Sequence, residues 1–397
     1  QPRTDGVGKP GDITVTAPQI TLADAGQISA STGRSEDSGD IDVTTQSLTL
    51  RGGGRIFAQT YGDGDGGNIS IRPQDTNQPS QVIIDGVAPV VPEQITIGGN
   101  TFIRPFGGLS SGLITSTEDQ DILYLEDPFV AIGNSLLSEI DGVSSTTGAG
   151  GSIFIEDIDA IEVTDGGVLT ARSRSIGSGG DIVIRRAETV SLRDGGQAIV
   201  GALDYRRGEA GNLTIDATAD FEVVGLDDTF LTRRANLQDS YHAYLTALLG
   251  NTILLSGQTQ LDATLLAAQR APIATAFTVD PIRANSGLIA QAGINSTGSG
   301  DIQVTTNGSL RLEDSGQIAS DTFGLGAAGD IELTIAENVE LSDFSQISSQ
   351  IAARGGSEAV LLPNGEESQR PAPLTEQNRI SVNARTLSVD SGSSIAA

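Results

Sequence analysis

Residues 39–60 read GDIDVTTQSLTLRGGGRIFAQT, and this stretch decides the fold. Apolar residues recur in it as pairs at positions i and i+2, namely Ile41/Val43, Leu48/Leu50 and Ile56/Ala58. Side chains two residues apart point to the same face of a β-strand, and mostly polar residues fill the positions between them. Corners rich in Gly, Asp and Ser separate the pairs. The stretch therefore predicts three short strands, each with one buried face, joined by tight corners.

The phrase that opens this stretch recurs along the chain. It consists of a glycine, then Asp, Asn or Ser, then alternating apolar and polar residues, and uninterrupted copies lie 28 to 31 residues apart. A repeat of this length cannot bury its apolar face alone, but stacked copies cover one another, which is typical of a solenoid. The copies begin at Gly11, Gly39, Gly67, Gly151, Gly180, Gly211, Gly300 and Gly329, with weaker copies at Gln120 and Asn378.

The repeats predict an all-β fold, a right-handed parallel β-helix (β-solenoid) of about ten three-strand coils that runs as a single body over residues 1–397. Neighbouring coils would pair in parallel about 4.8 Å apart, so ten coils would make a rod on the order of 50 Å long. Right-handed coiling is expected because parallel crossovers are almost always right-handed. An antiparallel sandwich of short strands is the alternative. It does not explain why the same phrase restarts after each third strand.

Insertions interrupt the repeats at two corners. Residues 87–108 and 225–285 both fall between the second and third strands of their coils, so both are expected to leave the rod at the same corner. The first reads as a β-hairpin around Gly98-Gly99-Asn100. The second has apolar residues at helical spacing from Leu237 to Leu249, which predicts an amphipathic helix that packs on the rod's flank in preference to a partner. Residues 353–376 leave another corner and predict an exposed loop.

The composition limits the classes of function. The chain has 397 residues, 23 Lys and Arg against 51 Asp and Glu, a formal net charge of −28, and no Cys, Met or Trp. This acidic excess argues against nucleic acid as a partner, because phosphate binding needs clustered Lys and Arg. No run of 18 apolar residues occurs, so we expect no membrane insertion. The absence of cysteine excludes thiol chemistry and a disulfide framework.

A polysaccharide lyase or hydrolase is the enzyme alternative, by analogy of fold alone. Acidic residues are so abundant that two of them near each other, at positions such as Asp24 and Asp314, would not indicate glycoside chemistry. The basic doublets are Arg185-Arg186, Arg206-Arg207 and Arg233-Arg234, and no Trp offers a platform for sugars. The single histidine, His242, has no cysteine partner for a metal site. We therefore expect no enzymatic activity and no required cofactor.

The glycine that opens each copy of the repeat is called here the restart glycine. A column of acidic residues follows these restart glycines. Asp, Asn and Ser alternate there, and all three can bond their own backbone at corners, which accounts for the mixture without a metal. Two carboxylates stacked about 5 Å apart at a wet surface repel by only about 0.8 kcal/mol, so no cation is required between them. Bound Ca²⁺ is possible on so acidic a body. The weak candidate ligands are Asp12, Asp40, Asp181, Asp301 and Asp330.

Phrases such as SGDIDVTTQSLTLRGGGRIFAQT, GNISI and SGLIAQA resemble the repeats of filamentous-haemagglutinin-like exoproteins, the large β-helical surface proteins of the two-partner secretion type. They look closest to the S-layer-family or haemagglutinin-like proteins of filamentous cyanobacteria. The resemblance covers nearly the whole chain outside the insertions. It implies an extracellular location on the outer surface of a Gram-negative-type bacterium, and service as an adhesin or surface fibre. The Asn-Pro-Asn-Gly type motif of that family's secretion domain does not occur here.

Neither end of the sequence carries a recognisable polar cap, so either the chain is a stretch of a longer protein or its ends stack on other copies. A head-to-tail contact that does not close makes a filament. We predict an extracellular structural protein that forms a fibre or surface layer by end-to-end stacking, with copies of itself as partners. An adhesin segment that binds glycans or cell surfaces is the alternative. Self-assembly is assigned to apolar residues of the terminal coils, namely Ile13, Val15, Ile20, Leu22 and Ile28 and Ile380, Val382, Leu387, Val389 and Ile395.

Overall fold

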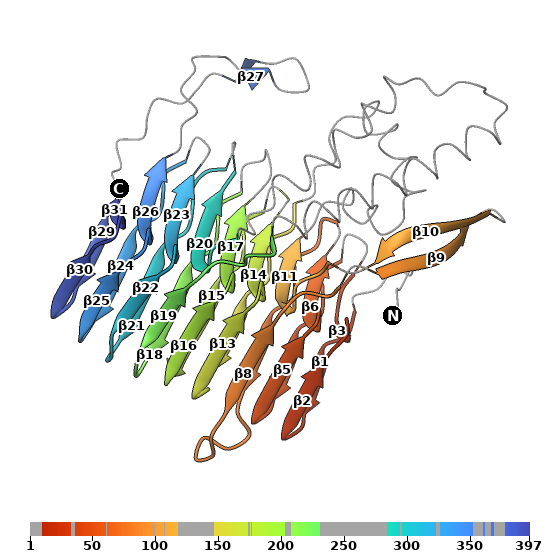
Figure 1. The fold of residues 1–397 in the computed structure, drawn as a ribbon. Helices are drawn as coiled ribbons and strands as arrows, with labels where there is room; N and C mark the ends of the chain where they lie inside the picture. The colour runs from red at the N-terminus through yellow and green to blue at the C-terminus, as the bar shows by residue number, and fades with distance from the viewer. Residues whose placement is uncertain are drawn as a thin grey trace.

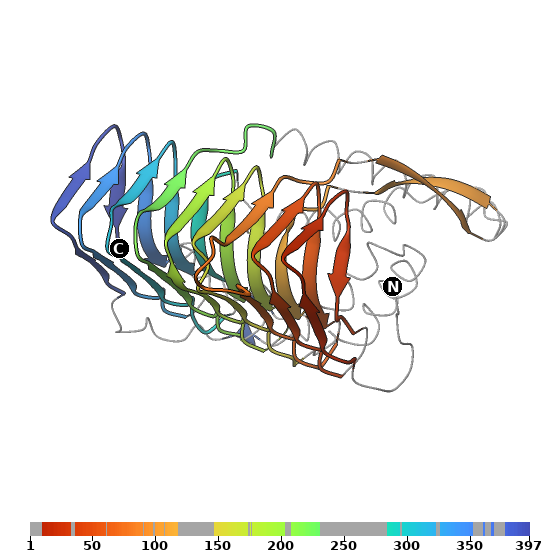
Figure 2. The same cartoon turned by 90° about the horizontal axis from the view of Figure 1, so that it is seen from below.

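The structure is a computed structural model of the chain. It describes residues 10–32, 36–60, 62–89, 91–97, 100–106, 108–117, 147–173, 175, 177–202, 208–230, 284–293, 296–322, 326–351, 360–361, 367–368 and 378–397. These residues form three parallel sheets of nine strands each, stacked as successive coils of one rod (Figures 1 and 2). The predicted parallel β-solenoid is thereby confirmed, and its right-handed coiling stays a prediction.

Each coil gives one strand to each sheet, in the order A, B, C along the chain, and the coils are numbered 1 to 9. Sheet A contains β1 (Ile13–Thr16), β4 (Ile41–Thr44), β7 (Ile69–Arg72), β12 (Ile153–Glu156), β15 (Ile182–Ala187), β18 (Leu213–Ala217), β21 (Ile302–Thr306), β24 (Ile331–Ile335) and β29 (Ile380–Asn383). Sheet B contains β2 (Gln19–Leu22), β5 (Ser47–Arg51), β8 (Gln81–Asp85), β13 (Ala160–Thr164), β16 (Thr189–Arg193), β19 (Phe221–Val224), β22 (Leu310–Glu313), β25 (Asn338–Leu341) and β30 (Thr386–Val389). Sheet C contains β3 (Gln27–Ser29), β6 (Arg55–Thr60), β11 (Gly112–Thr117), β14 (Val168–Ser173), β17 (Gln197–Ala202), β20 (Gly287–Ala292), β23 (Gln317–Thr322), β26 (Gln346–Ile351) and β31 (Ser394–Ala396).

The apolar pairs of the repeat line the interior as expected. In coil 2, Leu48, Leu50 and Ile56 are fully buried. The sheet register places equivalent residues of adjacent coils beside each other, so that Ile41 pairs with both Ile13 and Ile69. Columns of Ile, Leu and Val therefore run along the axis of the rod. Burial of each such side chain contributes roughly 1.5–3 kcal/mol.

The restart glycines stack on one another at the corner between sheets C and A. A Cβ atom added to Gly180 would overlap the backbone carbonyl of Gly151 in the preceding coil, and the same holds for Gly39, Gly67, Gly151, Gly211, Gly300 and Gly329. Gly11 begins coil 1, and a Cβ there would meet nothing within 4 Å. The repeated glycine is thus a consequence of coil stacking, because the neighbouring backbone occupies the space of a side chain.

The described residues form nine coils where about ten were expected. β7 pairs directly with β12, and β11 pairs directly with β14. The prediction that a coil begins at Gln120 was therefore wrong, since no coil lies between coils 3 and 4. The other weak copy, at Asn378, does open coil 9 through β29. A five-residue pattern of apolar and polar residues is too short to distinguish the weak copy at Gln120, which opens no coil, from the one at Asn378, which does. At the strand spacing of about 4.8 Å, nine coils span roughly 40 Å.

The corner between sheets B and C is where two long insertions leave the rod. In coil 3, β9 (Val91–Ile97) and β10 (Asn100–Phe106) form an antiparallel pair between β8 and β11, and this hairpin projects away from the coils (Figures 1 and 2). In coil 6, the chain leaves after β19 and returns at β20. The helix predicted from Leu237 to Leu249 lies outside the described residues. Between β26 and β29, where a loop was expected, β27 (Val360–Leu361) and β28 (Glu367–Ser368) pair antiparallel.

The outer face of sheet C departs from the predicted alternation of buried and exposed residues. Ile199 and Ala319 are 0 % exposed and Ile289 is 1 % exposed, yet they alternate with the residues that point into the core. The expectation that every strand has one buried face was therefore wrong for sheet C. Small and apolar residues occupy the central outward position of its strands, as at Ile199, Ile289 and Ala319, whereas polar and charged residues predominate at the outward positions of sheets A and B.

Candidate assembly faces and polar surface sites

The outermost coils expose the apolar rows that interior coils cover. In coil 9, Leu387 is 50 % exposed and Val389 is 43 % exposed, whereas their equivalents Val339 and Leu341 in coil 8 are 0 % and 1 % exposed. In the same coil, Ile380, Val382 and Ile395 are half-buried. In coil 1, Ile13, Val15, Leu22 and Ile28 are half-buried, while Ile20 is buried at 8 % exposure. The coil 9 face of the described rod thus presents exposed apolar side chains, and the coil 1 face presents four that are partly exposed.

The acids that follow the restart glycines form a continuous ladder of hydrogen bonds between coils. Asp12 Oδ1 accepts the backbone N–H of Asp40 at 3.0 Å, and Asp40 Oδ1 accepts that of Asn68 at 2.8 Å. The expectation that these side chains bond their own backbone was wrong, because stacking brings the next coil's N–H closer. The ladder continues through Asn68, Ser152, Asp181, Asn212, Asp301 and Asp330, with bonds of 2.7–3.0 Å.

The ladder ends at Arg379 in coil 9. The backbone N–H of Arg379 donates to Asp330 Oδ1 at 2.7 Å, but a guanidinium side chain has no acceptor for a further coil. Its Nη2 instead lies 3.9 Å from Asp330 Oδ2. Among the described residues, no three or more His, Cys, Asp or Glu side chains gather as a metal site. Bound Ca²⁺ on this column stays a prediction.

The carboxylates of the enzyme alternative do not come together. Asp24 and Asp314 occupy equivalent turn positions in coils 1 and 7, with φ of 51° and 49°. Six coil spacings of about 4.8 Å separate them by roughly 29 Å, well beyond the reach of two carboxylates acting on one bond. Their type is set by the turn, since Asp tolerates the left-handed region better than most residues. His242 and the doublets Arg206-Arg207 and Arg233-Arg234 lie outside the described residues.

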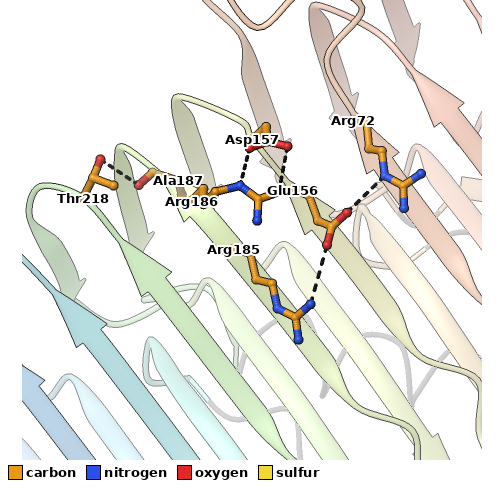
Figure 3. A network of polar contacts seen from close by, with 7 residues as sticks. All are labelled: Arg72, Glu156, Asp157, Arg185, Arg186, Ala187 and Thr218. Atoms are coloured by element: carbon orange, nitrogen blue, oxygen red, sulfur yellow. Dashed lines mark hydrogen bonds and ion pairs between the residues drawn. The ribbon is translucent and has the colours of Figure 1, made fainter.

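A polar network of side chains lies on the outer face of sheet A (Figure 3). Coils 4 and 5 each carry one extra residue after the apolar pair, Asp157 and Arg186, both in the left-handed region with φ of 59° and 55°. Arg186 Nε lies 2.5 Å from Asp157 Oδ1 and Nη2 lies 2.8 Å from Oδ2. This forked hydrogen bond lowers the pKa of the Asp157 carboxyl and raises that of the Arg186 guanidinium. Each extra residue makes a bulge in its strand, and this ion pair holds the two bulges of neighbouring coils together.

Beside the bulges, Glu156 bridges two arginines from neighbouring coils (Figure 3). Arg72 Nε lies 3.1 Å from Glu156 Oε2, and Arg185 Nη1 lies 3.8 Å from Glu156 Oε1. Both arginine side chains are more than half exposed, so each pair is worth at most about 1 kcal/mol. The sequence shows these residues 84 and 29 positions apart. Only alignment of equivalent positions in the repeat would have placed them together.

A shallow hollow of about 310 Å³ opens next to this network, on the same face of sheet A. It extends from the acid ladder across the sheet to the two bridged arginines. The aromatic side chain of Phe154 is half-buried there, beside the small side chain of Ser70 in the preceding coil. The residues that line the hollow are Asp40, Asp42, Asn68, Ser70, Arg72, Phe154, Glu156 and Arg185.

The two insertions leave the rod through the same structural device. In coil 3, the buried hydroxyl of Ser111 donates to Asp85 O at 2.7 Å and accepts the N–H of Gly53 at 2.9 Å. In coil 6, Ser286 donates to Val224 O at 2.7 Å and accepts the N–H of Gly195 at 2.9 Å. The recurrence of Ser-Gly before each returning strand was the sequence signal for it. This Ser clamp joins the base of each insertion to the preceding coil.

The structure thus defines the class of protein: a parallel β-solenoid with decorated corners and apolar end faces. Comparison with protein-family models, with curated proteins and with solved structures found no match to this chain. Within the part of the chain that the structure describes, no helix is long and apolar enough to cross a membrane.

Proposed function

We propose that this protein is an extracellular structural protein that forms a fibre or surface layer by end-to-end stacking of β-solenoid rods. The proposal rests on one observation above all: the outermost coils match each other position by position. In the register of the interior coils, Ile380 would stack on Ile13, Leu387 on Ile20 and Ile395 on Ile28 of the next copy. Apolar residues would therefore meet apolar residues in all three sheets.

The turns and the charges of the two faces also complement each other. Ser391 and Asp24 are equivalent turn residues with φ of 49° and 51°, so the two corners follow the same path. The same register places the guanidinium of Arg379 against the carboxylate of Asp12. Arg379 stands where all but one of the other coils carry Asp or Asn, so this junction would replace a ladder hydrogen bond with an ion pair.

The net charge of −28 favours axial over lateral association. Rods of like charge repel along their sides, while the apolar end faces attract. The resemblance to filamentous-haemagglutinin-like exoproteins supports the same proposal, and it implies a location at the outer surface of a Gram-negative-type bacterium. The adhesin alternative predicts dispersed rods that bind a surface ligand without stacking.

Negative-stain electron microscopy of the purified chain, over a concentration series with and without Ca²⁺, tests the proposal. We expect filaments with an axial repeat near the length of one rod. The double variant Leu387→Asp/Val389→Asp should abolish them, because it places two carboxylates on an apolar face that is already half exposed. Ser388→Asp is the matched control, since Ser388 lies on the same strand but points outward, and it should leave the filaments intact.

A charge reversal tests the register. Arg379→Glu should weaken assembly, because it replaces the guanidinium that faces Asp12 with a carboxylate on a longer side chain than the Asp residues of the ladder. The double variant Arg379→Glu/Asp12→Arg should restore part of the assembly. Short dispersed rods at every concentration, or filaments indifferent to Leu387→Asp/Val389→Asp, would contradict end-to-end stacking.

A further inference from the structure

We propose that the hollow on sheet A, lined by Phe154, Arg72, Asp42 and their neighbours, is a binding site for an uncharged hexose oligosaccharide. This site is independent of the end faces, because it spans coils 2 to 5 on the side of the rod. Its residues remain available whether or not the rods stack.

The hollow exists because one large side chain follows small ones in the same outward column. Asp42, Ser70 and Phe154 are neighbours in successive coils, and the ring of Phe154 stands beside the short side chain of Ser70. The half-buried aromatic ring of Phe154 is thereby part of the surface of the hollow. The carbon-bound hydrogens of a pyranose ring make an apolar face that suits such a surface.

Hydrogen-bonding groups lie on both sides of the Phe154 ring in the hollow. Asp42 offers its carboxylate oxygens and Ser70 offers its hydroxyl to the hydroxyls of a sugar. Asp40 offers Oδ2, because its Oδ1 accepts from the backbone and side chain of Asn68. On the far side, Arg72 presents guanidinium N–H groups beyond the single nitrogen that contacts Glu156. Apolar contact in the centre with a few polar groups around it is the usual composition of a small-ligand site.

The charges of the lining select a neutral ligand. Asp40, Asp42 and Glu156 carry three negative charges against the two positive charges of Arg72 and Arg185, and both arginines already pair with Glu156. A uronate or sulfated sugar would meet net repulsion here, on a chain with a formal charge of −28. An uncharged polyol meets none, and its hydroxyls form charge-assisted hydrogen bonds with the carboxylates.

An open hollow of this volume buries little of its ligand, so we expect weak binding by a single chain, with a Kd on the order of 1 mM. Saturation-transfer-difference NMR and isothermal titration calorimetry with maltotetraose, cellotetraose, laminaritetraose and mannotetraose would measure it, with tetragalacturonate as the charged comparison. We expect saturable binding of at least one neutral tetrasaccharide and at least tenfold weaker binding of tetragalacturonate.

Two pairs of variants locate the site. Phe154→Leu should weaken binding at least fivefold, whereas Phe344→Leu should not, because Phe344 is 75 % exposed at a corner of coil 8. Arg72→Gln should weaken it at least twofold, whereas Arg311→Gln, which removes a similarly exposed and paired arginine on sheet B, should not. The circular dichroism spectrum and melting temperature of each variant show whether it remains folded.

Three outcomes would overturn the proposal: no saturable binding of any neutral tetrasaccharide, binding that a folded Phe154→Leu variant retains in full, or tighter binding of tetragalacturonate than of every neutral sugar. Loss of filaments in the end-face variants with sugar binding intact would show that the two sites are separate.

Discussion

At the scale of single residues, the neighbouring coil decides which amino acid a position accepts. The restart position is glycine because the preceding coil's carbonyl lies where a Cβ would stand. The next position is Asp, Asn or Ser because each offers an oxygen to the following coil's N–H. These contacts join residues 28 or more positions apart. The local Gly-Asp, Gly-Asn or Gly-Ser motif is therefore required by packing between coils and not by local structure.

Substitution of a restart glycine tests this constraint. Gly180→Ala would force a Cβ onto the carbonyl of Gly151, and we expect it to destabilise the fold by about 1–3 kcal/mol. Gly11→Ala is the matched control, since nothing lies within 4 Å of the added atom, and its effect should stay within about 0.5 kcal/mol. Urea unfolding followed by circular dichroism measures both. Equal effects would show that the glycine column is not set by stacking.

The ion pair of the bulges makes stability depend on pH in a defined direction. The pKa of Asp157 is lowered in the folded state by hydrogen bonding to Arg186. Its stabilising contribution is therefore fully present above the unfolded value of about 3.9, and it is lost as the pH falls through the lower folded value. Arg186→Gln should reduce stability at pH 7, and this difference should vanish in strong acid.

NMR titration of the Asp157 carboxyl measures the pKa directly. It should move up toward the ordinary value in Arg186→Gln but much less in Arg185→Gln, because Arg185 pairs with Glu156 instead. An unchanged Asp157 titration in Arg186→Gln would contradict the assignment.

At the scale of elements, the corner between sheets B and C takes two forms: a tight turn in most coils and the base of an insertion in coils 3 and 6. Seven coils turn there with two successive residues at positive φ, such as Asp194 and Gly195. Coils 3 and 6 keep the first of these, as Gly86 and Gly225, and then leave the rod. The Ser clamp, at the point where the chain re-enters the coil, compensates for the missing turn. Its hydroxyl bonds the backbone N–H and the carbonyl that would lack a partner without the turn.

Removal of a clamp hydroxyl should loosen the base of its insertion. Ser111→Ala leaves the N–H of Gly53 and the carbonyl of Asp85 without this partner in a fully buried place, which costs about 1–3 kcal/mol. Ser286→Ala should behave alike, and the two effects should add because three coil spacings, about 14 Å, separate the two sites. Hydrogen exchange should speed up at Gly53 and Gly195, respectively. Exchange that is unaltered at these two amides would argue against the clamp.

At the scale of the whole molecule, the rod is a one-dimensional array in which each coil is stabilised only by its neighbours. Interior coils have two neighbours and bury their apolar rows fully, whereas coils 1 and 9 have one. In the proposed end-to-end stacking, the interaction that stabilises the rod would also be the one that assembles it. What joins coil 4 to coil 5 would also join coil 9 to the coil 1 of another copy.

Hydrogen exchange along the rod tests this equivalence. In dilute monomer, amides of β1 and β30 should exchange fastest and those of β16 and β18 slowest, because local opening follows neighbour contacts. On concentration, protection should rise at β1 and β30 and stay constant in the interior. Protection that rises evenly along the rod would point to lateral association instead.

The sequence by itself determined the solenoid, because period-2 apolar pairs recur in threes within a period of 28 to 31 residues, and stacked coils explain that recurrence where an antiparallel sandwich does not. It also located the corner of the insertions and the apolar rows of the end coils. It could not separate the false start at Gln120 from the true one at Asn378, because both carry the same local phrase and only strand pairing tells them apart. The tertiary structure alone decided the partners of the acid ladder, the burial of central outward side chains of sheet C such as Ile199, and the meeting of Arg72, Glu156 and Arg185. Each of these depends on which coil stacks on which, and insertions of unequal length hide that from the order of residues along the chain.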